Sequence, residues 1–147
     1  MHLTLHADYS LRVLLYLAAR PDRLASTQEL ADAYGISKHH LVRVVQTLAG
    51  EGFVEVKPGR AGGVTLARAP ADIAVGRVLR AAEPDFDLVE CFDRERNTCP
   101  ISPACGLKGV LREAREAFLA VLDRYTLADL VGRSRKDLAD LFLPVAS

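Results

Sequence analysis

The fold is decided by residues 26–49, which read STQELADAYGISKHHLVRVVQTLA. Ser26 and Glu29 have the spacing at which each side chain can bond the other's backbone N–H, so a helix is predicted to begin there. Gly35 can adopt the left-handed conformation that ends a helix, and Ser37 can cap the next one. Two helices joined by a short glycine turn predict a helix-turn-helix, although a plain three-helix bundle would show the same apolar spacing.

The second helix of this pair, residues 37–49, has one apolar and one polar face. The apolar face is predicted to be buried and consists of Leu41, Val44, Val45 and Leu48. The polar face is suited to enter the major groove, with hydrogen-bonding groups on Lys38, His39, His40, Arg43 and Gln46. The candidate DNA contacts at the starts of the two helices are Thr27 and Ser37.

A β-hairpin is predicted next, because residues 53–57 alternate as a strand and residues 64–67 return after a glycine-rich turn. Its cationic tip suits a wing that touches phosphates or enters the minor groove, with candidate contacts at Lys57, Arg60, Gly62 and Gly63. Tight turns need glycine for backbone reasons in any protein. With a further helix predicted at residues 7–19, the pattern predicts a mostly α fold with a winged helix-turn-helix domain in residues 1–80.

The composition is that of one small domain with an extension. The chain has 147 residues, of which 50% are hydrophobic, with 19 basic and 19 acidic side chains. This balance excludes polyanion binding through bulk charge, yet residues 1–80 hold ten Lys or Arg and seven Asp or Glu, whereas residues 81–147 hold nine and twelve. No apolar run approaches the roughly 20 residues of a membrane span, and no signal sequence is recognisable, so a cytoplasmic protein is expected.

The C-terminal half is predicted to supply a dimer interface. Asp72 is placed to cap a short helix that ends before Pro84. Further on, residues 106–147 are assigned to a dimerisation helix and a tail, and the helix has apolar side chains spaced by four and three residues: Leu107, Leu111, Ala114, Phe118, Val121 and Tyr125. Such a seam favours pairing with a second chain, although it could also pack only on its own winged domain. Thr126 is predicted to cap a last short helix.

All three cysteines lie close together in a segment, residues 81–105, that we assign as a cofactor-binding loop: Cys91, Cys99 and Cys105. Cysteines that only fill a core are scattered through it, so the clustering favours a thiol site. Structural zinc sites usually pair ligands at C-x2-4-C spacing, which this loop lacks. An iron–sulfur cluster tolerates wider spacing because each iron takes its own thiolate, and three thiolates leave one position for another ligand. A thiol switch is the second alternative and zinc the third.

Several motifs along the chain together resemble a known family. They are Leu3-Thr4, Asp8-Tyr9, Leu11-Arg12, YGIS at residues 34–37, GRAGG at 59–63, CPISPAC at 99–105 and YTLADL at 125–130. Over nearly its whole length the chain resembles the Rrf2 family of bacterial winged-helix regulators. The resemblance implies a homodimeric repressor of operator DNA whose iron–sulfur cluster reacts with nitric oxide as the signal.

The resemblance also implies the ligands of that cluster, which are Cys91, Cys99, Cys105 and Asp8 of the partner subunit. Without the resemblance, Asp8 is simply a carboxylate favoured in the first turn of a helix. Some family members use a histidine three residues after the last cysteine, and Lys108 at that place disfavours such a ligand set. The cluster type stays open between 4Fe-4S, which we favour, and 2Fe-2S. The alternative function is a regulator that senses iron–sulfur status or redox state.

Two other classes of protein fit the sequence less well. An electron-transfer protein would have no use for a donor-lined helix and a cationic wing. An enzyme would be expected to show a nucleotide-binding glycine loop or a nucleophile elbow, and the sequence shows neither. His39 and His40 lie where DNA contacts are expected rather than beside a catalytic partner, so we predict that the protein is not an enzyme.

Overall fold

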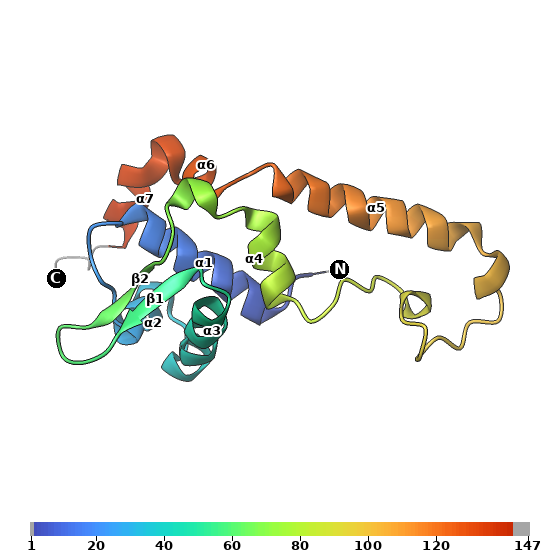
Figure 1. Ribbon diagram of the computed structural model, residues 1–147, viewed down its shortest axis with the longest axis horizontal. Helices are drawn as coiled ribbons and strands as arrows, with labels where there is room; N and C mark the ends of the chain where they lie inside the picture. The colour runs from blue at the N-terminus through green and yellow to red at the C-terminus, as the bar shows by residue number, and fades with distance from the viewer. Residues whose placement is uncertain (1, 143–147) are drawn as a thin grey trace.

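The computed structural model describes residues 2–142 and shows a helical body with a small hairpin and one long projecting arm (Figure 1). In chain order its helices and strands are α1 (Leu5–Ala19), α2 (Thr27–Tyr34), α3 (Lys38–Gly50), β1 (Val54–Lys57), β2 (Gly63–Leu66), α4 (Val75–Ala82), α5 (Gly106–Asp123), α6 (Leu127–Val131) and α7 (Arg135–Leu141). The predicted mostly α fold with a winged helix-turn-helix is confirmed. Residues 143–147 of the expected tail lie outside the described residues.

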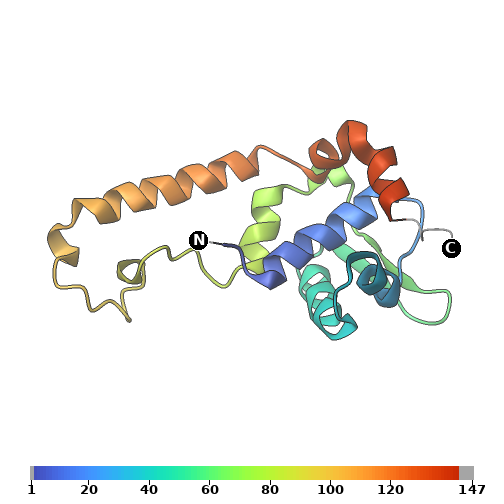
Figure 2. The ribbon, with the colours of Figure 1, turned by 180° about the vertical axis from the view of Figure 1, so that it is seen from behind.

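Helix α1 lies at the centre of the body, where it contacts α3, α4, α6, α7 and β2 (Figures 1 and 2). It begins at Leu5, earlier than predicted, because Thr4 Oγ1 accepts a hydrogen bond from Ala7 N at 3.1 Å and caps the helix. Its fully buried side chains include Val13, Leu14 and Leu17. The main hydrophobic core therefore forms around this helix.

The caps predicted for the helix-turn-helix are present. Ser26 Oγ accepts from Glu29 N at 3.0 Å, and Ser37 Oγ accepts from His40 N at 3.3 Å. Gly35 ends α2 with a φ of 63°, the left-handed conformation in which glycine meets no Cβ penalty. The predicted apolar face of α3 is buried, which confirms Leu41, Val44, Val45 and Leu48 as core residues.

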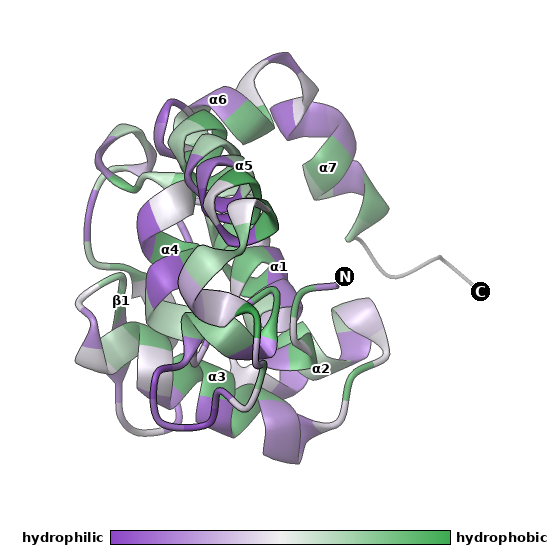
Figure 3. Ribbon diagram, turned by 90° about the vertical axis from the view of Figure 1, so that its right-hand side faces the viewer, coloured by the Kyte–Doolittle hydropathy of each residue, from purple (hydrophilic) through white to green (hydrophobic). Residues whose placement is uncertain are grey.

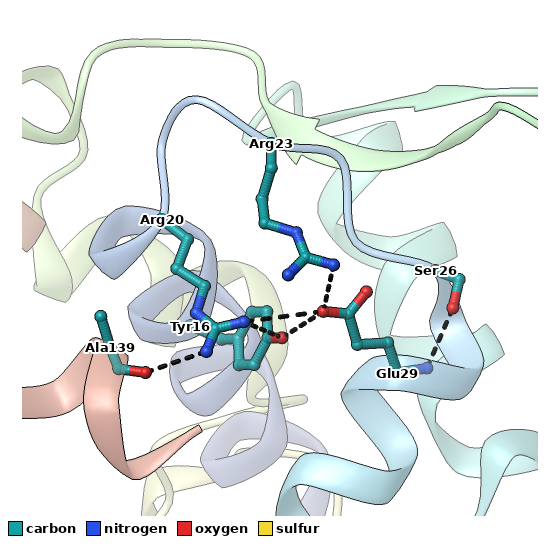
Figure 4. A network of polar contacts seen from close by, with 6 residues as sticks. All are labelled: Tyr16, Arg20, Arg23, Ser26, Glu29 and Ala139. Atoms are coloured by element: carbon teal, nitrogen blue, oxygen red, sulfur yellow. Dashed lines mark hydrogen bonds and ion pairs between the residues drawn. The ribbon is translucent and has the colours of Figure 1, made fainter. Parts of the chain in front are cut away.

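The reciprocal half of the predicted capping box is wrong, because the Glu29 carboxylate is used elsewhere (Figure 4). Tyr16 Oη donates to Glu29 Oε1 at 2.6 Å, and Arg23 Nη2 lies 2.8 Å from the same oxygen. Arg20 donates to Tyr16 Oη at 3.1 Å and to the carbonyl oxygen of Ala139 at 2.9 Å. This polar network joins α1, α2 and α7, so it fixes the helix-turn-helix to the rest of the body.

Burial, followed by the neighbouring Glu29, raises the pKa of Tyr16 to about 12 from its ordinary 10.0. A folded-state pKa above the unfolded one contributes stability that is complete below pH 10 and is lost as the pH rises to about 12. A shift of this size corresponds to about 2–3 kcal/mol. We expect Tyr16→Phe to remove this pH dependence, so the difference in unfolding free energy between wild type and variant should shrink by that amount between about pH 9 and pH 12.

Urea unfolding of both proteins across this pH range measures the effect. Tyr125→Phe is the control, because Tyr125 is 46% exposed and should follow the wild type. If Tyr16→Phe loses stability with pH as steeply as the wild type does, the assignment of this proton to Tyr16 is incorrect.

The hairpin is antiparallel and is anchored at its base. Its register pairs Val54 with Leu66 and Lys57 with Gly63. Ala25, just before α2, exchanges two backbone hydrogen bonds with Val64, at 3.0 and 2.8 Å. The wing is therefore held against the helix-turn-helix and projects from one side of the body (Figure 1).

The predicted cap of α4 is wrong. Asp72 belongs to a short 3-10 turn, Pro70–Asp72, and α4 itself begins later with Ala74 as its cap residue. Proline suits the first position of a helical turn because it has no N–H to satisfy, so the chain makes a separate turn at this point. Ala74 then forms a short antiparallel bridge with Thr126, and the carbonyl oxygen of Ile73 accepts a hydrogen bond from Leu127 N at 3.0 Å.

The loop of residues 83–105 leads away from the body, and helix α5 returns beside it, so that the two together form the arm (Figures 1 and 2). None of the α5 side chains is buried in the described protomer. The view along the arm shows hydrophobic and hydrophilic ribbon segments on different sides of α5 (Figure 3). The predicted long helix is therefore present, although it ends before Tyr125, the last residue of the expected seam.

Two further helices follow the arm. Thr126 caps α6 through the full capping box with Asp129, as predicted, but α6 is not the last helix. Helix α7 packs against α1, where the ring of Phe142 lies 4.7 Å from that of Tyr16 and 5.3 Å from that of Tyr34. No helix among residues 2–142 is both long and apolar enough to cross a membrane.

Candidate nucleic-acid interface and cysteine loop

The outer face of α3 is cationic and exposed. The donor-bearing side chains predicted there are all exposed, namely Lys38, His39, His40, Arg43 and Gln46. Helix α3 contains no acidic residue, and none of these side chains forms an ion pair within residues 2–142. Phosphate groups attract such unpaired cations, so the electrostatics of this face suit a polyanion.

The polar residues of α3 differ in where they point. His40 and Arg43 line a cavity of about 230 Å³ between α3 and the start of α1, and the His40 ring lies 6.4 Å from the ring of Tyr9. By helical periodicity His39 shares the outermost line of α3 with Val42, which is 39% exposed. Gln46 instead lines, with Arg43, a second hollow that includes Thr4 and His6 at the start of α1. Val42 was not among the predicted DNA contacts. An aliphatic side chain at this place could contact a thymine methyl group.

His6 is a second residue that sequence reasoning missed. Its Nε2 lies 3.1 Å from Thr47 Oγ1, which joins the start of α1 to the recognition helix α3. The contact spans 41 positions of the chain, so no local sequence signal identifies it.

The remaining predicted contacts near the turn have structural roles. Ser37 Oγ is used to cap α3, and Thr27 is the half-buried first residue of α2. In the wing, Lys57 and Arg60 are exposed, whereas Gly62 and Gly63 are half-buried. The structure thus brings the predicted DNA contacts to α3, the start of α2 and the wing, and it assigns the two glycines a role in shaping the wing.

Gly62 is required by the wing backbone. A Cβ atom at this position would lie 2.0 Å from the carbonyl oxygen of Lys57 and 2.7 Å from that of Pro58. We expect Gly62→Ala to force the hairpin tip open, to lower stability by about 1–3 kcal/mol and to weaken DNA binding. Arg60→Gln is the matched comparison, because it should leave stability unchanged and only reduce the salt dependence of binding, by about one phosphate contact.

Thermal unfolding and salt titration of binding to a duplex measure these effects. Equal thermal stability of Gly62→Ala and the wild type would show that the tip has room for the methyl group.

The cysteine loop contains three free thiols in different environments. Cys91 is buried in a 3-10 turn, Glu90–Phe92, whereas Cys99 and Cys105 are half-buried. Cys105 is the cap residue of α5, and its side chain makes no capping hydrogen bond. Within residues 2–142 the structure brings no three Cys, His, Asp or Glu side chains together as a metal site.

The loop is attached to the rest of the protein near its middle and at its start. The guanidinium carbon of Arg115 lies 4.8 Å from the centre of the Phe92 ring, which holds the loop against α5. Glu83 Oε1 accepts a hydrogen bond from Thr4 N at 2.7 Å, which ties the start of the loop to the start of α1. The thiols are therefore carried by a segment with defined attachments and little regular structure of its own.

Asp8 lies in the first turn of α1 and pairs with Arg12, 2.8 Å away. Its side chain is 39% exposed, so a group from outside the protomer can reach it. The donor set fits an iron–sulfur cluster chemically, because three thiols are free of disulfides and an accessible carboxylate is available as an oxygen ligand. Asp8 and the cysteines are not assembled within one described protomer.

The helix-turn-helix, the exposed cationic face of α3 and the hairpin wing define a winged-helix DNA-binding protein. A family model for Rrf2, described as an iron-dependent transcriptional regulator, matches residues 3–133. The chain belongs to the Rrf2 family. It is accordingly a transcriptional regulator and not an enzyme.

Individual relatives support this assignment. The chain is 52% identical over 142 residues to the HTH-type transcriptional regulator NsrR of Bacillus subtilis (strain 168), covering 96% of this chain and 97% of that protein. It is 51% identical over 132 residues to NsrR of Shouchella clausii, covering 89% of each chain. Among solved structures, T. potens IscR superimposes with a TM-score of 0.72 at 25% identity, covering 99% of this chain and 94% of that one. The global cysteine regulator CymR of B. subtilis superimposes with a TM-score of 0.68 at 25% identity, covering 88% and 95%.

Proposed function

We propose that this protein is an iron–sulfur-containing repressor that binds operator DNA as a homodimer and releases it in response to nitric oxide. The observation that supports it most is the confinement of three free thiols to one loop at the end of an arm attached to a winged-helix body. The similarity to NsrR proteins and the iron dependence named for the family support the same proposal.

Cys91, Cys99 and Cys105 would hold the cluster, with Asp8 of the partner subunit as the fourth ligand. When bound, the cluster supplies iron that reacts with nitric oxide. A carboxylate is a weaker ligand for such iron than a thiolate, so the Asp8 position is the one suited to exchange. In the isolated protomer Arg12 pairs with Asp8 and keeps it at the surface of α1.

The recognition helix and the wing would read the operator. The outermost line of α3 faces base edges in the major groove, while Lys57 and Arg60 of the wing contact the backbone or the minor groove. A single helix of this size buries too little surface for high specificity, so two copies are needed on a near-palindromic site.

The apolar face of α5 would supply the dimer contact. The side chains that lie exposed on this face are Leu107, Val110, Ala114, Phe118 and Val121. Exposed apolar side chains at this spacing gain most by packing against an identical helix. A homodimer would place the loop of one protomer near α1 of the other, which the proposed ligand set requires.

Purification without air, followed by absorption and Mössbauer spectroscopy, iron analysis and a nitric oxide titration read by operator binding, tests this function. We expect a coloured, iron-containing dimer whose operator affinity falls when nitric oxide is added. A colourless, iron-free protein that binds its operator fully and ignores nitric oxide would contradict the proposal.

A thiol-based redox sensor is the second candidate, since all three thiols are free and Cys105 lies at the N-terminus of α5. The same preparation separates the two functions. A redox sensor would lack iron, and its DNA binding would respond to an oxidant and recover with a thiol reductant.

A further inference from the structure

Both ends of the arm are attached to helix α4. The loop leaves α4 at Glu83, and α5 returns to the same helix, where Asp123 meets Arg80. The guanidinium and carboxylate form two parallel bonds, with Nη1–Oδ1 at 2.5 Å and Nη2–Oδ2 at 2.8 Å. Just beyond α5, Val75 N donates to the carbonyl oxygen of Tyr125 at 2.9 Å.

A buried glycine makes this contact sterically possible. A Cβ atom at Gly76 would lie 2.0 Å from Asp123 Oδ1 and 3.0 Å from Arg80 Nη1. The carboxylate of Asp123 therefore lies against α4 at a position that a Cβ atom could share only if the end of the Asp123 side chain moved away. We call Gly76, Arg80 and Asp123 the α4–α5 clamp.

The clamp contributes more to the direction of α5 relative to the body than to the free energy of unfolding. The Arg80 and Asp123 side chains are 44% and 42% exposed, and ion pairs with such exposure contribute little to the free energy of unfolding. Two parallel hydrogen bonds between planar groups do fix the relative orientation of their helices. Helix α5 has no buried side chain, so few other contacts define its angle to the body.

Helix α4 is connected to the recognition helix through α1. Leu79 and Ala82 of α4 form a small buried cluster with Ala7 of α1, and Leu122 of α5 packs against it. His6, the neighbour of Ala7, contacts Thr47 of α3. A change in the angle of the arm would thus reach α3 through the buried α4–α1 cluster and the His6–Thr47 hydrogen bond, and also through the direct contact of α4 with α3.

We propose that the α4–α5 clamp positions the arm on the body and transmits the state of the cysteine loop to the recognition helix. This inference rests on the proposed function, because it assigns Gly76, Arg80 and Asp123 as positioning residues for the response to nitric oxide. None of the three lies in the cysteine loop or on the exposed face of α3. They act by setting the angle between the arm and the winged-helix body.

Gly76→Ala tests the clamp without changing charge. The added methyl group displaces the end of the Asp123 side chain, while alanine is favoured over glycine in a helix, so we expect the unfolding temperature not to fall. Iron content and dimer mass should equal those of the wild type. The fold-change in operator affinity on adding nitric oxide, about tenfold or more for a coupled regulator, should drop below about threefold.

Gly109→Ala is the matched control, because a Cβ atom at Gly109 in α5 meets no other atom within 4 Å. It should respond to nitric oxide as the wild type does. A second test uses charge: Arg80→Asp and Asp123→Arg should each reduce the fold-change, and the double variant should restore it.

The outcomes separate the two proposals. A Gly76→Ala variant with the wild-type fold-change overturns the clamp while leaving the proposed function intact. Failure of the charge-swapped pair to restore the response, with both single variants impaired, also counts against it. A wild-type protein without iron or without any response overturns both.

Discussion

Cys99→Ala is expected to yield a folded protein that contains no iron, lacks visible absorption and no longer changes its operator affinity with nitric oxide. Of the three proposed protein thiolates, Cys99 is held in the middle of the loop by Asn97, whose Oδ1 accepts a hydrogen bond from Cys99 N at 3.1 Å. With one thiolate lost, two cysteines and a carboxylate are too few to hold a cluster. Iron analysis and absorption of protein prepared without air measure the loss.

The fold should survive this change, because Cys99 is half-buried and lies outside both hydrophobic clusters. Ser102→Ala is a suitable control, since Ser102 lies in the same loop and its hydroxyl accepts a hydrogen bond from Lys108 Nζ at 3.4 Å, while its backbone bond to the carbonyl oxygen of Cys99 is kept in the variant. It should keep the iron and the response. A Cys99→Ala protein that stays coloured and responsive would remove Cys99 from the ligand set.

If the protein forms the proposed homodimer, Phe118→Glu is expected to convert it into a monomer and to lower operator affinity by about a hundredfold or more, because the two half-sites would no longer be bound together. The Phe118 ring is 43% exposed in the protomer and lies between Ala114 and Val121 on the apolar face of α5. A pair of carboxylates brought together in an apolar interface cannot be solvated. Sedimentation and operator titration measure mass and affinity.

Ala120→Glu supplies the comparison for this variant. It places the same carboxylate on α5 but on the opposite side of the helix, where Ala120 is already exposed. Mass and affinity should equal those of the wild type. If Phe118→Glu stays dimeric, the apolar face of α5 is not the contact between protomers.

The parts of the fold that local chemistry determines were predictable. The hydroxyls of Ser26 and Ser37 cap the helices that follow them, and Gly35 supplies the left-handed residue between, all within a few positions of the chain. The wing follows from alternating strand residues and a glycine turn. In these places the residues that interact in the structure are also close together in the sequence.

Predictions failed where a distant partner competed with a local one. The Glu29 carboxylate bonds to Tyr16, 13 positions away, and therefore does not complete the local capping box. The Asp72 cap failed for a local reason instead, because Pro70 begins a separate turn that includes Asp72. Helix α7 has no side-chain cap and owes its position to aromatic packing of the adjoining Phe142 on Tyr16 and Tyr34, which no local pattern announces.

The candidate site also has parts that short segments of sequence reveal and parts that they do not. The cationic face of α3 and the clustering of the cysteines are visible in the sequence, since both are properties of short segments. The assembly of Asp8 with the cysteines is not visible in one protomer, because the proposed set needs residues from two chains. The α4–α5 clamp joins Arg80 to Asp123 across 43 positions of the chain. It also depends on Gly76, and no neighbouring residue in the sequence indicates that this glycine contacts Asp123.

The lack of buried side chains on α5 affects how fast the protein is degraded. In a protomer that has not formed the proposed dimer, none of the 18 residues of α5 has a fully buried side chain. Proteases cut segments that open easily, and a helix with no fully buried side chain opens more easily than a helix of the core. We therefore expect unpaired chains to be cleared faster than paired ones, so that the amount of regulator rises more steeply than its rate of synthesis.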